Sequence, residues 1–350
     1  MKRYGYLYEK IYNIDNIKLA HENAKKGKNH YKEVKMVDKN PEKYFSDIQN
    51  LLKYKTYKNS KYKITIKKTD NGKIRKIYKL PYFPDRIIHH SIIQIIEQIW
   101  FKSLIRDTFS SIKGRGIYDG FKRVKKSLIN KENTKYCLKL DIKKYYPSID
   151  NKILKQIIRK KIKDKDLLWL LDEIIDSTKG LPIGNYLSQY FGNLYLSTLD
   201  HYCKTKIKFY FRYADDIVIL HKDKHILHEI KNDIESYLNN NLKLQLNKNW
   251  QIFPVDKRGI DFLGYKFFHN YILLRKSIKK RFIKNYNKII KDYNKIEWTK
   301  IVHSIMSYYG WFKFINCKNL QNKYFNDDLY RIVEKTCVNQ NINNTLKKIS

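Results

Sequence analysis

The sequence predicts an α+β fold in which antiparallel strands and helices occupy separate stretches of the chain. Segments 62–68 and 73–80 alternate in polarity on either side of a short polar turn, as the two strands of a hairpin do. Segment 207–220 holds two further β-rich runs, again broken by a short turn. Residues 276–350 are basic and carry apolar residues at helical spacing. We therefore expect β-hairpins early and midway, followed by a helical C-terminal lobe.

The N-terminal third of the chain is expected to form helices, a hairpin turn and one buried helix. Residues 1–60 show weakly periodic apolar positions between basic runs and predict helices that wrap a core. Asp70-Asn71-Gly72 supplies residues that accept positive φ in the turn of the first hairpin. After Pro84, Asp85 is expected to cap a buried helix. That helix carries apolar or small residues at helical spacing: Ile87, Ile88, Ser91, Ile92, Ile95, Ile96, Ile99 and Trp100.

In the middle of the chain, hydrophobic periodicity and turn residues predict the elements. Its expected elements are a basic helix near 117–130, an apolar strand at 136–142, a mainly polar helix over about 150–176, a turn leading into an aromatic helix within 181–200, a helix at 224–241 and short strands within 242–268. Asp215 and Asp216 are expected at the tip of the 207–220 hairpin.

Charge is the first clue to function. The 350 residues include 73 Lys and Arg against 34 Asp and Glu, a formal net charge of +39. Such a surplus repels itself in a compact protein unless a polyanion offsets it, and phosphate backbones are the natural candidate. Nucleic acid is therefore the expected partner.

Cysteine usage and hydropathy bear on the compartment. The four cysteines are far apart and form no C-x-x-C pair, which argues against a structural zinc site or a disulfide framework. No run reaches the ~18 apolar residues that span a bilayer, and the N-terminus lacks an apolar signal core. We expect a cytoplasmic protein with no membrane partner.

Three carboxylates carry the expected chemistry. Asp141 ends the apolar run YCLKLD, and Asp215-Asp216 interrupts another. Strand interiors disfavour Asp, and adjacent carboxylates repel one another unless a cation lies between them. Oxygen ligands from neighbouring strands suit Mg²⁺, and two such ions can activate a 3′-hydroxyl and stabilise a leaving pyrophosphate. This pattern indicates nucleotide polymerisation.

The segment Tyr213-Ala214-Asp215-Asp216 within an apolar hairpin, preceded by LDIKKYYPSI at 140–149, resembles the palm of the reverse transcriptases. The resemblance implies a right-hand polymerase that copies RNA into DNA with an RNA template, a DNA or RNA primer and deoxynucleoside triphosphates. Its implied parts are an N-terminal helical extension over 1–60, fingers and the start of the palm over 61–135, palm over 136–270 with fingers helices inserted at about 151–180, and thumb over 271–350.

The resemblance also implies roles for single residues. Asp141 and Asp215 would hold two Mg²⁺ ions, which Mn²⁺ can replace, with help from the Ile142 carbonyl, and Asp216 would complete the acidic cluster. Tyr146 would lie under the sugar and reject a 2′-hydroxyl, because a rigid ring blocks one added oxygen. Either Tyr145 or Tyr146 can instead serve packing.

Further implied contacts are basic or glycine-containing. Arg75 and one of Lys67 or Lys68 would contact the triphosphate, since Arg pairs in a bidentate manner and Lys acts as a point charge. Lys248 would stand near the leaving pyrophosphate as a proton donor, although a solvated surface lysine is the simpler reading. Residues Phe262, Leu263 and Gly264, within GIDFLGY, resemble the primer grip.

The segment LPIGNYLSQ at 181–189 narrows the resemblance to reverse transcriptases of diversity-generating retroelements, because Ile183 replaces the usual Gln before Gly184 and Gln189 replaces the usual Pro after Ser188. The resemblance implies that Ile183, Gly184 and Gln189 contact the deoxynucleoside triphosphate. Ile183 offers shape without a hydrogen bond, which discriminates between correct and incorrect nucleotides by roughly 1–3 kcal/mol at best. The resemblance implies error-prone copying at template adenines, a bacterial, archaeal or phage-encoded source, and a small basic accessory protein oligomer as partner. The alternatives are a retron-type, group II intron-like or phage-defence reverse transcriptase, and a non-catalytic RNA-binding scaffold.

Overall fold

The computed structural model describes residues 2–68, 72, 74–292 and 296–324, and it confirms the α+β class. The chain forms two compact units. The first comprises Met1–Val124 and Leu138–Ile252, and the second comprises Lys125–Cys137 and Phe253–Ser350. None of the helices within these described ranges is both long and apolar enough to cross a membrane.

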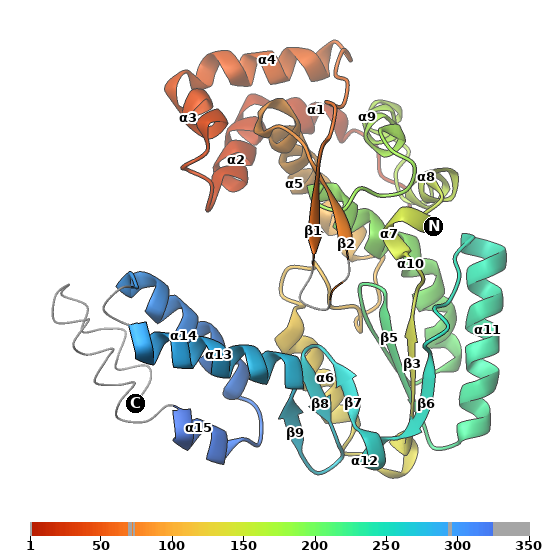
Figure 1. Ribbon diagram of the computed structural model, residues 1–350. Coiled ribbons are helices and arrows are strands. Elements are labelled where there is room, and N and C mark those ends of the chain that lie inside the picture. Colours follow the sequence, from red (N-terminus) through yellow and green to blue (C-terminus); the bar gives the residue numbers. More distant parts are fainter. Residues whose placement is uncertain (1, 69–71, 73, 293–295, 325–350) are drawn as a thin grey trace. The chain divides into compact units, whose positions relative to one another are not determined.

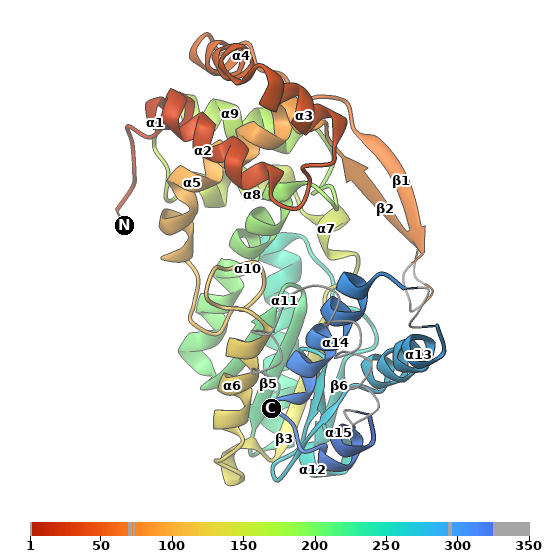
Figure 2. The same cartoon turned by 90° about the vertical axis from the view of Figure 1, so that its left-hand side faces the viewer.

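The first unit begins with a group of helices, as the periodicity of residues 1–60 predicts. They are α1 (Tyr8–Tyr12), α2 (Ile14–Lys25), α3 (Lys32–Lys39) and α4 (Pro41–Lys53). The helices α1 and α2 pack on the apolar helix α5 (Ile87–Phe101), and Figure 2 shows this group together. The predicted buried helix is thus confirmed, and it forms the core of the N-terminal group.

Asp85 does not cap α5, so that prediction is wrong. The residue lies inside a π-helical turn, Tyr82–Arg86, that leads directly into the helix. Its side chain is fully buried, and Oδ1 accepts hydrogen bonds from the Tyr57 hydroxyl at 2.7 Å and from the Ser60 amide at 3.1 Å. Tertiary partners from the chain before the first hairpin have taken the place of the helix amides.

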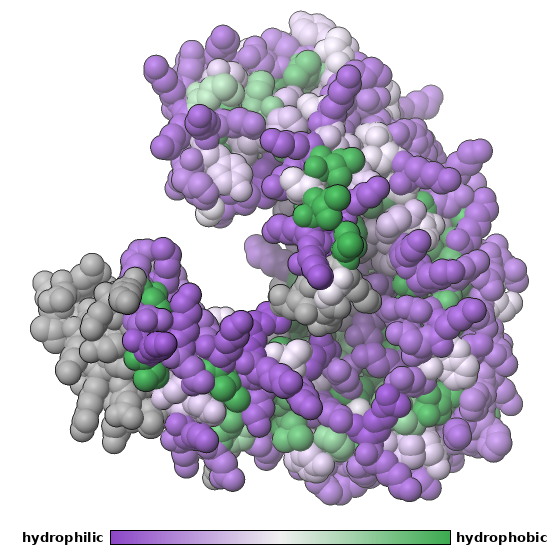
Figure 3. Space-filling view, viewed as in Figure 1, coloured by the Kyte–Doolittle hydropathy of each residue, from purple (hydrophilic) through white to green (hydrophobic). Residues whose placement is uncertain are grey.

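The first hairpin is confirmed as β1 (Lys63–Lys68) paired antiparallel with β2 (Ile74–Lys79). Gly72 has φ +75°, as the predicted turn requires, whereas Asp70 and Asn71 lie outside the described residues. One face of the ribbon carries Ile64, Ile66 and Ile74, which are 52%, 70% and 72% exposed. Figure 3 shows these hydrophobic side chains as a cluster over the hairpin.

A four-stranded sheet carries the predicted acids. Its strands are β3 (Tyr136–Asp141), β4 (Phe209–Tyr213), β5 (Asp216–His221) and β6 (Gln251–Pro254), in the spatial order β4-β5-β3-β6. Helix α11 (Lys224–Leu242) packs on β5 and on α10 (Tyr186–Lys206) (Figure 1). The basic helix α6 (Ile117–Ser127) precedes β3 as expected. The chain passes between the two units within α6, β3 and β6.

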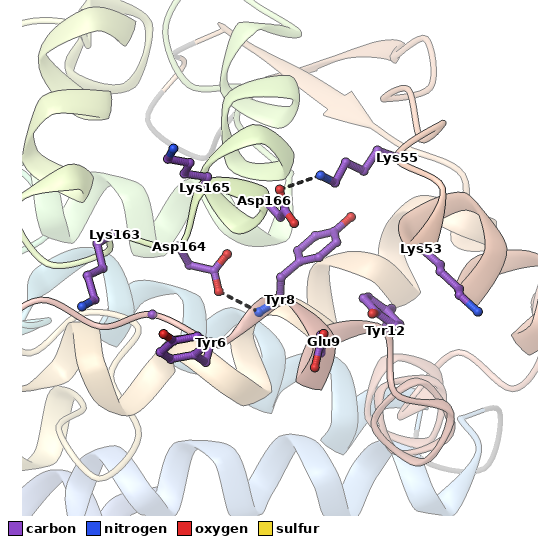
Figure 4. Close-up of a pocket in the computed structure, with 11 residues that line it drawn as sticks. Tyr6, Tyr8, Glu9, Tyr12, Lys53, Lys55, Lys163, Asp164, Lys165 and Asp166 are labelled. Carbon is purple, nitrogen blue, oxygen red and sulfur yellow. Dashed lines mark hydrogen bonds and ion pairs between the residues drawn. The ribbon is translucent and has the colours of Figure 1, made fainter.

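The single helix expected over 150–176 is wrong, because the chain forms α8 (Asn151–Arg159) and α9 (Lys165–Asp176) after the short α7 (Tyr145–Ser148). Asp164 separates them: its Oδ1 accepts from the Leu167 amide at 3.1 Å and so caps α9. Its Oδ2 accepts from the amides of Leu7 and Tyr8 at 2.6 and 3.0 Å. Asp164 and Tyr8 line a cavity of about 510 Å³. Figure 4 shows the two residues side by side. Asp164, which contacts the N-terminal segment, therefore marks the break between α8 and α9.

The second unit holds a three-stranded antiparallel sheet and helices. Strands β7 (Ile260–Phe262), β8 (Tyr265–Phe267) and β9 (Ile272–Leu274) pair in chain order. The helices are α12 (Val255–Arg258), α13 (Lys276–Asp292), α14 (Trp298–Phe312) and α15 (Lys318–Tyr324). The helical C-terminal lobe is thus confirmed as far as residue 324, and residues 325–350 lie outside the described chain.

Candidate active site

The β4–β5 turn presents Asp215 and Asp216 at the end of the sheet. Tyr213 pairs with Asp216 across the ladder, and Ala214 between them has φ +54°. A non-glycine residue in this left-handed region needs support from its surroundings. Arg212 provides it, since its Nη1 donates to the Ala214 carbonyl at 2.8 Å. The β4–β5 turn is therefore stabilised by the Arg212 side chain of β4.

Asp141 ends the neighbouring strand β3 and is held by Asn247. The Asn247 amide donates to the Asp141 carbonyl at 2.8 Å, and its Nδ2 donates to Asp141 Oδ2 at 3.1 Å. The Lys143 amide also donates to the Gln245 carbonyl at 2.9 Å, so Ile142 and Leu246 form a pair that exchanges no hydrogen bond. In such a pair the backbone groups point outward from the partner. The Ile142 carbonyl therefore points away from Leu246, toward the side on which β5 flanks β3.

Asp216 shares a face of the sheet with Asp141. Side chains two apart on a strand point to the same face, so Lys139 and Asp141 lie together on the half-exposed side of β3. Lys139 Nζ lies 3.5 Å from Asp216 Oδ2, which brings the Asp216 carboxylate to that side. Lys139 supplies a positive charge where the acids would otherwise repel one another.

The electrostatics of Asp215 link these residues. Burial raises the pKa of its carboxyl group, and the neighbouring Asp141 charge raises it further, while Arg75 and Arg212 act in the opposite direction. A cation bound between Asp141 and Asp215 would relieve this repulsion, and their oxygens with the Ile142 carbonyl are donors that suit Mg²⁺. Within the described ranges no three His, Cys, Asp or Glu side chains form a ready-made metal cluster. The two carboxylates and the Ile142 carbonyl are oxygen donors of the kind that a hard cation such as Mg²⁺ prefers.

The two tyrosines after Asp141 differ in their surroundings. Tyr145 is buried, its hydroxyl donates to the Gly192 carbonyl, and burial raises its pKa well above the usual value. Tyr146 is half-buried, and burial together with the Asp215 charge raises its pKa to about 12. Both rings rest on α10, where a Cβ on Gly192 would lie 3.4 and 3.6 Å from them. Tyr145 is therefore the packing residue, whereas Tyr146 keeps part of its surface exposed.

Ile183 and Gly184 contact the first hairpin through their backbone. The Tyr78 amide of β2 donates to the Ile183 carbonyl at 2.7 Å. Gly184 has φ +109°, and a Cβ there would lie 2.8 Å from the Tyr78 carbonyl oxygen and 2.9 Å from Cγ2 of Ile77. Only glycine permits this approach. The loop therefore anchors the hairpin, while the Ile183 side chain takes no part in that hydrogen bond.

The register of the hairpin separates the candidate triphosphate contacts. Lys67 lies opposite Arg75, so both project from one face, whereas Lys68 lies opposite Ile74 on the other face. All three basic side chains are exposed. Arg75 is also the hairpin residue whose charge offsets part of the rise in the pKa of Asp215 and of Tyr146. The geometry thus favours Lys67 over Lys68 as the partner of Arg75.

Gln189 and Lys248 are both exposed. Gln189 Oε1 accepts from the Ser111 hydroxyl at 2.8 Å, so its side chain is turned toward the segment after α5. Lys248 follows Asn247 in the chain, and Asn247 is the residue that holds Asp141.

The residues proposed as a primer grip belong to the second unit. Phe262 and Leu263 are buried there, and Gly264 has φ +86°. A Cβ on Gly264 would lie 2.6 Å from the Trp311 ring. The glycine therefore allows close packing of this turn on α14, in addition to any approach by a strand backbone.

Sequence reasoning missed a buried network beneath the catalytic turn. Arg212 and Asp200 are both fully buried and form a two-pronged ion pair, and the Tyr210 hydroxyl donates to Asp200 Oδ1 at 2.7 Å. Arg212 also donates to Asn193 Oδ1 at 3.2 Å and to its carbonyl oxygen at 3.3 Å. The signal for this network was an Arg within the apolar strand FYFRY, where a charge requires a buried partner. The position of that partner, on α10, had no local signal.

Comparison with known proteins identifies the class. The solved structure of apo telomerase from Candida tropicalis matches 81% of this chain and 58% of that chain, with a TM-score of 0.50 and 13% identity, which supports the polymerase fold alone. Residues 66–267, more than half of the chain, match the reverse transcriptase (RNA-dependent DNA polymerase) family. The chain belongs to that family.

Two curated relatives are distant. Protein YkfC of Escherichia coli is 23% identical over 56% of this chain, and the COX1/OXI3 intron 2 protein of Saccharomyces cerevisiae is 24% identical over 39% of it. The matched regions span 64% and 24% of those proteins.

Proposed function

We propose that this protein is an RNA-directed DNA polymerase. The observation that carries the proposal is the pair Asp141, at the end of β3, and Asp215, in the β4–β5 turn, which interact electrostatically beside an outward-pointing Ile142 carbonyl. Mg²⁺ bound there would lower the charge on the attacking and leaving oxygens of a nucleotidyl transfer. The family to which the chain belongs supports the same chemistry.

The chain's own residues would then act around that centre. Arg75 and Lys67 share the hairpin face that would meet a triphosphate. The half-buried Tyr146, which interacts electrostatically with Asp215, would lie under the sugar. Asp216 would balance charge with Lys139, and Lys248 would donate a proton to the leaving pyrophosphate. We assign the hairpin and neighbouring helices to the fingers, the four-stranded sheet to the palm, and residues 271–350 to the thumb.

Primer extension tests this function directly. The purified chain, an RNA template, a DNA primer, deoxynucleotides and Mg²⁺ should give template-dependent products, and Asp215→Ala should abolish them. Asp233→Ala is a matched control, since Asp233 is an exposed carboxylate paired with Lys206 on the outer surface of α11. Binding of RNA without any extension by the unsubstituted chain would favour the non-catalytic scaffold instead.

We further propose that copying is error-prone, as in a diversity-generating retroelement. The support is the Ile183 side chain, which cannot offer a hydrogen bond near the candidate nucleotide site, and Gln189, which follows Ser188 in the same segment. Because the anchoring bond to Tyr78 uses the Ile183 backbone, Ile183→Gln changes the side chain without removing that bond. Sequenced extension products should show fewer errors at template adenines for Ile183→Gln. An unchanged adenine error rate would remove this role.

A group II intron-like reverse transcriptase is the second candidate, favoured by the similarity to an intron 2 protein of yeast. A retron-type or phage-defence enzyme would share the same palm. Accurate copying at adenines by the unsubstituted chain would favour these alternatives. For the retroelement function we expect a small basic accessory protein to co-purify, and a near-duplicate repeat that differs at adenines to lie beside the gene.

A further inference from the structure

Asn247 lies opposite Asp141 on two short backbone segments. Residues 245–247 run antiparallel to residues 141–143, and the Asn247 amide donates to the Asp141 carbonyl at 2.8 Å. Side chains at facing positions of such a pair project from the same face. The backbone therefore places the Asn247 side chain beside the Asp141 carboxylate.

The Asn247 side chain binds one oxygen of that carboxylate and leaves the other. Its Nδ2 donates to Asp141 Oδ2 at 3.1 Å. An ionised carboxylate only accepts hydrogen bonds, so the amide nitrogen of Asn247, and not its amide oxygen, must face Asp141. Among the described residues no donor is hydrogen-bonded to Asp141 Oδ1. The two carboxylate oxygens therefore differ: one is bound to the protein, and the other is available to a ligand.

The residue that restrains Asp141 is neutral. A lysine or arginine at position 247 would also hold Oδ2, but its positive charge would repel a cation bound to the same carboxylate. An amide donates a hydrogen bond without adding charge. Asn247 thus fixes the orientation of Asp141 and leaves its negative charge for a metal ion.

The number of carboxylate oxygens that reach an ion discriminates between divalent cations. Ca²⁺ takes about six to eight oxygen ligands at roughly 2.3–2.6 Å and accepts both oxygens of one carboxylate. Mg²⁺ is smaller and requires nearly octahedral geometry at about 2.0–2.1 Å, which the two closely spaced oxygens of one carboxylate satisfy poorly. A carboxylate restricted to one oxygen therefore suits Mg²⁺ and deprives Ca²⁺ of a ligand.

We infer that Asn247 is a positioning residue that makes Asp141 a one-oxygen ligand and so selects Mg²⁺ over Ca²⁺ at the acidic site. The inference rests on the proposed function for the presence of a divalent cation between Asp141 and Asp215. Asn247 touches neither the ion nor the substrate in this role. It acts through Oδ2, because loss of that hydrogen bond frees the carboxylate to rotate and to bind through both oxygens.

Metal-dependent shifts of the thermal midpoint of the full chain test this role without catalysis. Separate titrations with Mg²⁺ and with Ca²⁺ give an apparent Kd for each ion. Asn247→Ala keeps the backbone hydrogen bond to Asp141 and removes only the side-chain donor. Its Kd for Mg²⁺ should rise roughly tenfold, as is typical when the partner of a metal ligand is lost. Its Kd for Ca²⁺ should stay the same or fall, so the preference for Mg²⁺ should drop by about tenfold or more.

Two further variants control this measurement. Asn249→Ala makes the same change at an exposed position of the same segment and should leave both Kd values unchanged. Asn247→Leu keeps a branched side chain of similar size without a donor, so it should lose the preference for Mg²⁺ even where Asn247→Ala is destabilised. Equal weakening of both ions in the two Asn247 variants would show a structural role only, and it would overturn the inference.

Primer extension separates this inference from the proposed function. The activity of Asn247→Ala should recover as Mg²⁺ is raised, with the KM for primer–template unchanged, and Ca²⁺ should inhibit it at a lower concentration than it inhibits the unsubstituted protein. A chain that prefers Mg²⁺ through Asn247 but extends no primer would refute the polymerase function and leave the inference intact. A chain that extends primers, and whose ion preference is the same in Asn247→Ala, would refute the inference alone.

Discussion

Arg212 donates from Nε to Asp200 Oδ1 at 2.7 Å and from Nη2 to Asp200 Oδ2 at 2.6 Å, and neither side chain has any exposed surface. The same guanidinium supports the Ala214 carbonyl, so a buried ion pair holds the turn that presents Asp215. Asp200 is in turn fixed by Tyr210 and by the Thr108 hydroxyl at 3.2 Å. The geometry of the acidic turn therefore depends on α10.

Asp200→Asn should lower the free energy of unfolding by about 3–5 kcal/mol, because it leaves a buried guanidinium without its counter-charge. Urea or thermal denaturation of the full chain measures the effect. Asp233→Asn breaks an exposed ion pair with Lys206 and should shift the midpoint far less. Equal shifts in the two variants would show that burial of the Arg212 pair carries no special weight.

Asp215→Asn should raise the thermal midpoint at pH 7 while it removes activity. The pKa of Asp215 is raised in the folded state, so its ionised form costs stability above that pKa, and the cost disappears as pH falls through it. The difference in thermal midpoint between the unsubstituted protein and Asp215→Asn should therefore narrow toward pH ~4, near the ordinary Asp pKa of about 3.9.

Mg²⁺ provides the control for the comparison of the unsubstituted protein with Asp215→Asn. Added Mg²⁺ should raise the midpoint of the unsubstituted protein and leave that of Asp215→Asn nearly unchanged, because the ion would relieve repulsion that the variant lacks. Chelation should reverse the gain. A midpoint that responds equally in both proteins would place the ion elsewhere.

Tyr146→Ala should let the polymerase accept ribonucleotides, with a loss of roughly 100-fold in discrimination against the 2′-hydroxyl. Relative kcat/KM for matched deoxy- and ribonucleotides measures this. Tyr145→Phe removes only the hydroxyl that donates to Gly192, so it should cost about 1 kcal/mol of stability and leave sugar selectivity alone. Selectivity lost in Tyr145→Phe and kept in Tyr146→Ala would reverse the two assignments.

Gly184→Ala should weaken the hold of the 181–185 loop on β2, since the added methyl would meet the Tyr78 carbonyl and the backbone has φ +109°. The left-handed conformation alone costs roughly 1–2 kcal/mol, and limited proteolysis at the hairpin should become faster. Gly116→Ala is the matched control, because no atom lies within 4 Å of its added Cβ and its φ is not in the positive range. Identical proteolysis of both variants would contradict the anchoring role.

Elements whose signal is local were predictable. The alternating strands of the first hairpin, the apolar helix α5 and the hairpin bearing Asp215 follow from periodicity and turn chemistry within short windows. The break between α8 and α9 and the role of Asp85 were not predictable. Both depend on carboxylates whose partners are distant in sequence: Asp164 binds amides near residue 7, and Asp85 binds Tyr57.

The same division holds for the site. The sequence by itself determined which acids stand at strand ends, that Tyr145 and Tyr146 follow one of them, and that the chain carries charge suited to nucleic acid. Only the tertiary structure decided that Tyr145 is buried and donates to Gly192 while Tyr146 stays half-buried, that Lys67 shares a face with Arg75, and that Arg212 supports the turn through Asp200. The reason is physical: a strand or turn records its own propensity in neighbouring residues, whereas a buried charge is stabilised by a partner that folding alone brings near.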